Sequence, residues 1–96
     1  MPAIGADVRR MRRPPSHPGE VISAEFLEPM GMTQAQAAAK MGITANRLNE
    51  IVKGKRGVSA DTAWKLAGLF GTSPGLWMNL QSNWDLWHAA PARRSA

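Results

Sequence analysis

Helix-capping residues and glycines recur at short intervals in the stretch TQAQAAAKMGITANRLNEIVKG, residues 33–54. Thr33 and Gln36 have the spacing of a capping box, in which each side chain hydrogen-bonds the backbone N–H of the other residue. Gly42 fits the left-handed conformation that ends many helices, and Thr44 is a preferred N-cap residue only two positions later. The stretch therefore predicts two short helices joined by a tight glycine turn.

Apolar residues elsewhere in the chain recur at helical spacing, and no segment alternates polar and apolar residues as a half-buried strand does. A proline or a hydroxyl residue precedes most of these segments, and a glycine follows them, as at helix starts and ends. The expected helices span about residues 18–29, 35–41, 44–53, 59–70 and 73–87. The sequence thus predicts an all-α fold of five helices that contains a helix-turn-helix motif.

The length and composition are those of one globular domain. The chain has 96 residues, of which 44% are apolar and 20% are charged, a balance far from that of disordered chains. We expect a flexible basic arm over residues 1–15, a folded domain over 16–88 and a tail over 89–96. The absence of cysteine and of a recognisable targeting segment suits a protein of the cytoplasm.

The charge of the chain favours a polyanionic partner. Its net charge is +5 and its pI is near 10.8, which is typical of proteins that bind nucleic acid. One basic cluster lies at residues 9–13, a second at Arg93–Arg94, and a third, KGKR at residues 53–56, follows the helix-turn-helix motif directly. This last cluster suits phosphate contacts, although a solvated turn explains its composition equally well.

The helix expected over residues 44–53 has one apolar side and one polar side. Leu48, Ile51 and Val52 share the apolar side, and the other carries short hydrogen-bonding side chains. A helix fits the major groove of B-DNA, where asparagine pairs with adenine and arginine with guanine. An ordinary solvated surface is the alternative interpretation. The candidate DNA-contacting residues are Gln34, Thr44, Asn46, Arg47, Asn49, Lys53, Lys55 and Arg56.

An aromatic stripe near the C-terminus suggests a second surface. Trp77, Leu80, Trp84 and Trp87 follow one another at spacings of three, four and three, so they share one side of a helix. Large apolar patches on a small domain usually mean association, and we expect these four residues to form a homodimer interface. Plain core packing is the alternative.

Three stretches of the sequence resemble a known family. They are RRPPSHPGE at residues 12–20, NRLNEIVKGKRGVSADTA at 46–63 and FGTSPGLWMNLQSNWDLW at 70–87. Together they are similar to the HigA-type antitoxins, a branch of the XRE, or lambda-repressor-like, helix-turn-helix proteins. The resemblance covers most of the chain and implies a lambda-repressor-like DNA-binding domain.

The resemblance also implies a function and partners. A member of this family is expected to be the antitoxin of a type II toxin-antitoxin system. It would neutralise a HigB/RelE-like mRNA-cleaving toxin and, as a homodimer, repress its own operon by binding operator DNA. A stand-alone XRE-family repressor without a toxin is the alternative. For the toxin, the acidic residues Glu20, Glu25 and Glu28 offer one possible surface, and a solvated helix face explains them as well.

An enzyme is not predicted. The His17–Glu20 and Asp85–His88 pairs are the histidine–carboxylate pairs at helical spacing, and each is at most half of a metal site. Helix capping explains the first pair and pairing on a helix surface the second. The sequence contains no phosphate-binding glycine loop and no cysteine nucleophile. We therefore expect no catalytic residues, no metal and no cofactor.

Overall fold

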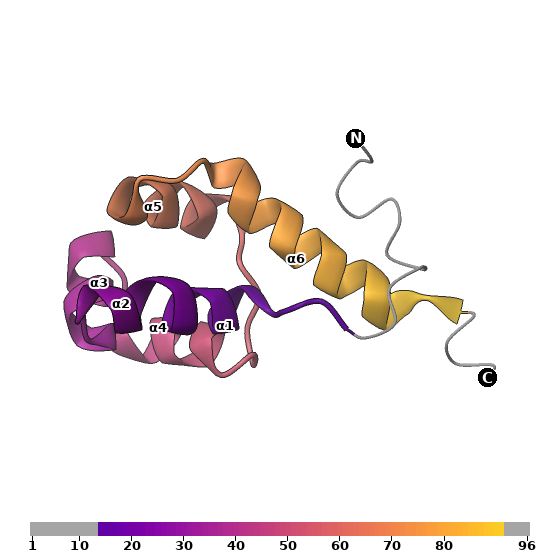
Figure 1. Ribbon diagram of the computed structural model, residues 1–96, viewed down its shortest axis with the longest axis horizontal. Helices are drawn as coiled ribbons and strands as arrows, with labels where there is room; N and C mark the ends of the chain where they lie inside the picture. Colours follow the sequence, from indigo (N-terminus) through magenta and orange to yellow (C-terminus); the bar gives the residue numbers. More distant parts are fainter. Residues whose placement is uncertain (1–13, 92–96) are drawn as a thin grey trace.

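The structure is a computed structural model that describes residues 14–91 of the chain, and within this range every regular element is a helix (Figure 1). The predicted all-α helix-turn-helix fold is confirmed. The expected basic arm, apart from residues 14 and 15, and the tail from residue 92 lie outside the described residues. The elements are α1 (Pro18–Val21), η2 (Ile22–Leu27), α2 (Glu28–Met30), α3 (Gln34–Met41), α4 (Ala45–Val52), α5 (Ala60–Phe70) and α6 (Pro74–Ala89).

The first predicted helix is continuous but is not a regular α-helix. Its middle, η2, is a π-helix, and at its end the N–H of Glu28 donates to the carbonyl of Ser23. Pro29 follows directly, and a proline ring inside a helix crowds the carbonyl four residues earlier. The wider π turn accommodates this crowding. The helix predicted over about 18–29 is therefore present, and its π-helical middle is a feature that the sequence pattern did not indicate.

The helix-turn-helix motif is α3 followed by α4, and its capping follows the sequence prediction. Thr33 Oγ1 accepts a hydrogen bond from the Gln36 N–H at 3.1 Å, and Gln36 Oε1 accepts one from the Thr33 N–H at 2.9 Å. Gly42 ends α3 with a φ of 74°, in the left-handed region where only glycine is free of strain. Thr44 Oγ1 then caps α4 by accepting from the Arg47 N–H at 3.0 Å.

The core lies between the helix-turn-helix motif, the first helix and the α5–α6 pair. Its fully buried side chains include Ile22, Leu48, Ile51 and Leu66. Trp77 of α6 belongs to it as well, with none of its surface exposed, and it donates from Nε1 to Thr72 Oγ1 at 2.7 Å. The expectation that Trp77 lies in a dimer interface is therefore wrong, because a side chain with no exposed surface has none to offer a partner.

Helix α4 packs against the first helix through a close backbone contact. Gly19 of α1 lies so close to the end of α4 that a Cβ atom there would overlap the carbonyl oxygen of Ile51 and lie 2.7 Å from Cα of Val52. Only hydrogen fits in this space. The apolar face of α4 is thereby turned inward, and its polar face is left outward.

Candidate nucleic-acid interface

The outward side of α4 presents polar side chains, as the sequence predicted. Leu48 and Ile51 have no exposed surface, whereas Thr44 and Asn46 are exposed at the start of the helix. A helix with exposed hydrogen-bonding residues at its N-terminal end can enter a DNA major groove. Asn46 is exposed, and no hydrogen bond of its side chain is seen among residues 14–91, so a ligand can reach it.

Two of the predicted residues, from different helices, are held together. Asn49 Nδ2 on α4 donates to Gln34 Oε1 at the start of α3, at 3.0 Å. Both residues are half-buried. The pair leaves the amide oxygen and one N–H of Asn49, and both N–H groups of Gln34, for other partners. The structure thus brings together a helix N-terminus, which suits a phosphate, and an amide group, which suits a base edge.

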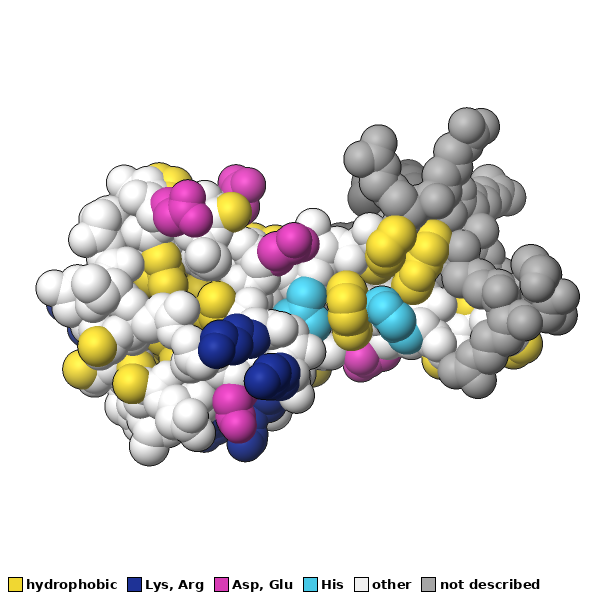
Figure 2. Space-filling model, turned by 90° about the horizontal axis from the view of Figure 1, so that it is seen from below, with side chains coloured by type: hydrophobic (Ala, Val, Ile, Leu, Met, Phe, Trp, Pro, Cys, Tyr) yellow, Lys and Arg dark blue, Asp and Glu magenta, His cyan; other side chains and the backbone are white. Residues whose placement is uncertain are grey.

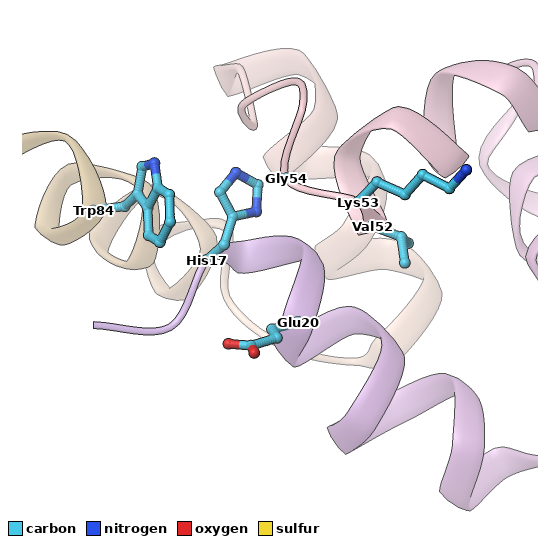
Figure 3. A pocket seen from close by; sticks show the side chains of 6 residues that line it. All are labelled: His17, Glu20, Val52, Lys53, Gly54 and Trp84. Carbon is cyan, nitrogen blue, oxygen red and sulfur yellow. The ribbon is translucent and has the colours of Figure 1, made fainter. Parts of the chain in front are cut away.

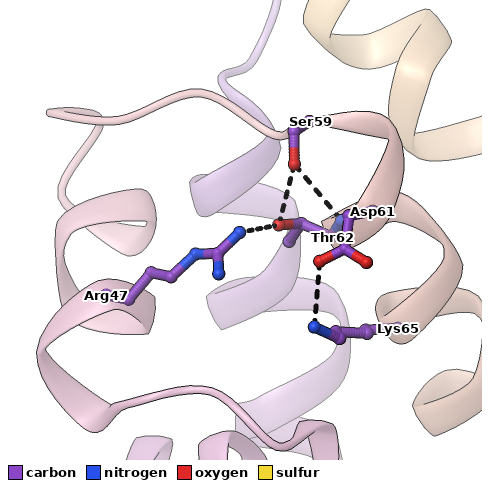
Figure 4. Close-up of polar contacts among 5 residues, drawn as sticks. All are labelled: Arg47, Ser59, Asp61, Thr62 and Lys65. Atoms are coloured by element: carbon purple, nitrogen blue, oxygen red, sulfur yellow. Dashed lines mark hydrogen bonds and ion pairs between the residues drawn. The ribbon is translucent and has the colours of Figure 1, made fainter.

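Arg47 points away from the other outward residues, toward α5. Its Nη2 donates to Thr62 Oγ1 at 2.8 Å, and its Nε is buried with no hydrogen-bond partner (Figure 4). Thr62 is itself 1% exposed and lies one turn after Ser59, which caps α5. Thr62 was not predictable as a site residue, since a threonine on the buried side of an expected helix gives no sign of which distant residue it contacts.

The loop after α4 carries the predicted basic residues, and one of them, Arg56, forms an ion pair. Lys53 and Lys55 are exposed. Arg56 Nη2 and Glu50 Oε1 form an ion pair at 3.0 Å, and the N–H groups of Lys55 and Arg56 both donate to the carbonyl of Glu50. Figure 2 shows Lys and Arg side chains grouped on one face, on which both histidines also lie. Glu50 thus organises the loop and offsets part of its charge.

A cleft of about 340 Å³ adjoins this loop and is lined by His17, Glu20, Val52, Lys53, Gly54 and Trp84 (Figure 3). His17 is 6% exposed and caps α1, because its Nδ1 accepts from the Gly19 N–H at 2.9 Å. Its ring meets that of Trp84 edge-on, with 5.0 Å between the ring centres. Burial lowers the pKa of His17, against the opposing effects of Asp85 and Glu20. The prediction that capping explains the His17–Glu20 pair is confirmed for His17.

The remaining predicted residues fall on other surfaces. Glu20, Glu25 and Glu28 are all exposed, and a cleft of about 240 Å³ lies between the first two. On α6, Leu80, Trp84 and Trp87 are half-buried. Asp85 accepts a hydrogen bond from Gln81 Nε2, and His88 Nδ1 lies 2.8 Å from the carbonyl oxygen of Trp84.

No group of three or more His, Cys, Asp or Glu side chains within residues 14–91 is arranged to hold a metal ion. No helix in that range is long and apolar enough to cross a membrane.

Known proteins share this chain's sequence and fold. The helix-turn-helix family model matches residues 24–77. Virulence-associated protein I of Dichelobacter nodosus is 39% identical over 82 residues, which are 85% of this chain and 76% of that protein. Antitoxin HigA-1 of Vibrio cholerae is 41% identical over 81 residues, 83% of this chain and 75% of that protein.

A solved structure extends the likeness to three dimensions. The structure of the Pseudomonas aeruginosa antitoxin HigA with the higBA promoter superposes with a TM-score of 0.79 at 41% identity, and the match covers 84% of this chain and 88% of that one. The chain therefore belongs to the helix-turn-helix family, in its HigA-type branch.

Proposed function

We propose that this protein is the antitoxin of a type II toxin-antitoxin system and represses its own operon by binding operator DNA. The observation that carries the proposal is the orientation of α4, whose apolar side is buried while Thr44, Asn46 and the Gln34–Asn49 pair face outward. The similar HigA of Pseudomonas aeruginosa was solved with promoter DNA. Such a protein works where the DNA is, in the cytoplasm, and needs no catalytic residue or cofactor.

In this proposal the DNA contacts divide by chemistry. Asn46 and Asn49 meet base edges in the major groove, where asparagine pairs well with adenine. Gln34 meets a phosphate together with the free N–H groups at the start of α3. Lys53, Lys55 and Arg56 meet phosphates of the adjoining backbone, which position the protein without reading sequence. Thr44 sets the start of α4 through its cap.

Titration of the DNA upstream of the protein's own gene tests this assignment. Asn46→Ala should weaken binding to the operator much more than binding to unrelated DNA. Lys55→Ala should weaken both alike and reduce the slope of log K against log salt by about one unit. Lys40→Ala, a surface lysine at the far end of α3, is the matched charge control. Operator binding that is no stronger than binding to unrelated DNA would refute the repressor function.

We also propose that the repressor is a homodimer formed through α6. The burial of Trp77 excludes it from a dimer interface, and Trp84 packs on His17. The proposed interface therefore lies on a neighbouring side of α6, displaced around the helix from the predicted stripe. Leu76, Leu80 and Trp87 lie on one side at spacings of four and seven, and each has exposed or half-buried surface. A two-fold axis there would place two copies of α4 on DNA half-sites about 34 Å apart, as paired recognition helices require.

Sedimentation velocity distinguishes the dimer from core packing alone. Leu76→Glu places a charge on the proposed interface and should shift the protein to a monomer with its helical content unchanged. Met30→Glu, at an exposed residue of α2, is the matched control and should leave the dimer intact. A wild-type protein that sediments as a monomer at micromolar concentration would rule out the α6 dimer.

The proposed protein partner is a basic, HigB-like toxin. The three exposed glutamates of the first helix, Glu20, Glu25 and Glu28, supply a surface of opposite charge for it. Purification of the tagged protein from its host should recover this partner at fixed stoichiometry, and Glu25→Lys combined with Glu28→Lys should weaken the recovery. If the homodimer elutes alone and still binds the operator, the protein is instead a stand-alone repressor.

A further inference from the structure

We infer that Arg47 binds a phosphate of the DNA backbone and does not read a base, and that Thr62 of α5 holds it in position for this contact. The inference rests on the proposed DNA-binding function. It assigns a different role to the residue that sequence reasoning pairs with guanine, and it adds Thr62 to the residues on which operator affinity depends.

The Arg47 side chain is directed toward α5. It leaves α4 toward the first turn of α5, and its Nη2 lies 2.8 Å from Thr62 Oγ1 (Figure 4). Asn46 and Asn49, in contrast, stay on the outward side of α4. The guanidinium therefore lies at the flank of the recognition helix, where a helix seated in the major groove adjoins the phosphates of one groove wall.

Arg47 has only part of its hydrogen-bonding capacity left for DNA. Arginine reads guanine by presenting two adjacent N–H groups together to O6 and N7. Of the two edges that a guanidinium can present in this way, the one formed by Nε and Nη2 is not available, because Nε is buried and one N–H of Nη2 donates to Thr62. The N–H groups of Nη1 and the second N–H of Nη2 remain. A phosphate needs only a positive charge and one or two N–H donors, which can come from a broad range of directions. The remaining N–H groups of the Arg47 guanidinium supply these.

Thr62 is suited to position the guanidinium. Its side chain is almost fully buried and is held by Ser59, whose Oγ accepts from the Thr62 N–H at 3.3 Å and lies 3.2 Å from Thr62 Oγ1. When the Thr62 hydroxyl donates to Ser59, its lone pairs are free to accept from Arg47.

Asp61, the carboxylate next to Thr62 in the chain, forms no ion pair with Arg47 in the part of the chain that the structure describes. Asp61 accepts a hydrogen bond from Lys65 at 2.9 Å, so it is already paired within α5. The hydrogen bond from Lys65 lowers the pKa of Asp61, and the charge of Arg47 contributes to this lowering after the larger effect of Lys65. The hydrogen-bond partner of Arg47 is the neutral hydroxyl of Thr62, so its guanidinium can still form a charge-assisted hydrogen bond with a phosphate.

The test compares variants on the operator and on a set of operators that each differ by one base pair. Arg47→Ala should lower affinity for all of them by the same factor, about tenfold, and reduce the salt slope by about one unit. Arg47→Lys keeps the charge and should keep the slope. Thr62→Val removes only the hydroxyl and should lower affinity severalfold, with base preference and slope unchanged. Asn46→Ala is the positive control for an altered base preference.

Three outcomes overturn the inference. One is a changed ranking of the single-base operators with Arg47→Ala, since that would mean base reading. Another is unchanged affinity and slope with that variant. Unchanged affinity with Thr62→Val removes its positioning role. Thermal melts verify that each variant is folded, and Arg47→Lys keeps the test decisive if Arg47→Ala is unstable. Failure of the wild-type protein to prefer its operator would instead refute the proposed function.

Discussion

Asn49 of α4 donates a hydrogen bond to Gln34 of α3 over 3.0 Å, so the two helices of the motif are joined on their outward side by a pair of side-chain amides. The bond fixes the plane of the Asn49 amide before any DNA is present. A base contact by asparagine depends on that plane, because both its oxygen and its nitrogen must meet adenine at once.

A double-mutant cycle on this pair should show coupling in DNA affinity. We expect Asn49→Ala to cost about 1–3 kcal/mol of operator binding and Gln34→Ala to cost less. The double variant should lose less than the sum, by about 0.5 kcal/mol or more, because Gln34 acts in part through Asn49. Fluorescence anisotropy with labelled operator gives all four affinities. Strictly additive losses would mean that the two amides act independently on DNA.

Removal of the Glu50 charge should strengthen binding to DNA of any sequence. Glu50 pairs with Arg56 over 3.0 Å and faces the same side as the basic loop. Glu50→Gln frees Arg56 for a phosphate and removes a repelling charge, so the salt slope should steepen by up to about one unit. The thermal midpoint should change little, because an exposed ion pair contributes only about 0–1 kcal/mol. Glu25→Gln, on the first helix, is the charge-matched control, and an equal effect there would contradict the prediction.

Gly19→Ala should strongly destabilise the fold. The added methyl group would overlap the carbonyl oxygen of Ile51, a backbone atom that has no rotamer to change. Overpacking of this kind costs typically about 1–3 kcal/mol and sometimes more. Urea denaturation followed by circular dichroism measures the loss. Gly68→Ala is the matched control, since a Cβ there meets no atom within 4 Å and alanine favours a helix by up to about 1 kcal/mol. Equal stability of the two variants would refute the close contact.

The stability of the protein should fall with acidification through His17. Burial holds its pKa below the ordinary 6.5, so around that pH the unfolded chain binds more protons than the folded chain. The free energy of unfolding therefore decreases as the pH drops from about 7 through 6.5 toward the folded-state pKa. Protonation of Nδ1 also removes the acceptor that caps Gly19.

His17→Asn provides the comparison for this pH effect. Asparagine is a good N-cap residue and does not titrate in this range. Urea midpoints measured from about pH 8 to 5 should run parallel for the two proteins above pH 7 and diverge below it, with the wild type losing more stability. Parallel curves over the whole range would show that His17 does not cause the acid sensitivity.

The parts of the fold that depend on neighbours in sequence were predictable. The capping box of Thr33 and Gln36, the cap at Thr44 and the left-handed Gly42 each act within a few residues, and all three lie in the structure where the sequence places them. The buried side of α4 followed in the same way from its periodicity. Local hydrogen bonds and helical spacing carry this information entirely within one segment.

Contacts between distant segments were not predictable in this way. Trp77 and Trp84 share one side of α6, yet the first packs in the core on Phe26 and Phe70 and the second meets His17. One helix thus has different neighbours along its length, which spacing alone does not reveal. The Arg47–Thr62 and Gln34–Asn49 bonds each join residues 15 positions apart. They depend on how helices cross, and no pattern in either segment specifies that.

Because of the contact between Gly19 and Ile51, the packing position of α4 does not depend on which side chains it presents outward. The contact is made by a hydrogen atom on one side and by main-chain atoms on the other, so it places no demand on the outward side chains of α4. Residues 46 and 49 can therefore be substituted while α4 keeps its packing position against α1. Operator preference in this scaffold is accordingly open to redesign, or to drift between relatives, without repacking of the domain beneath it.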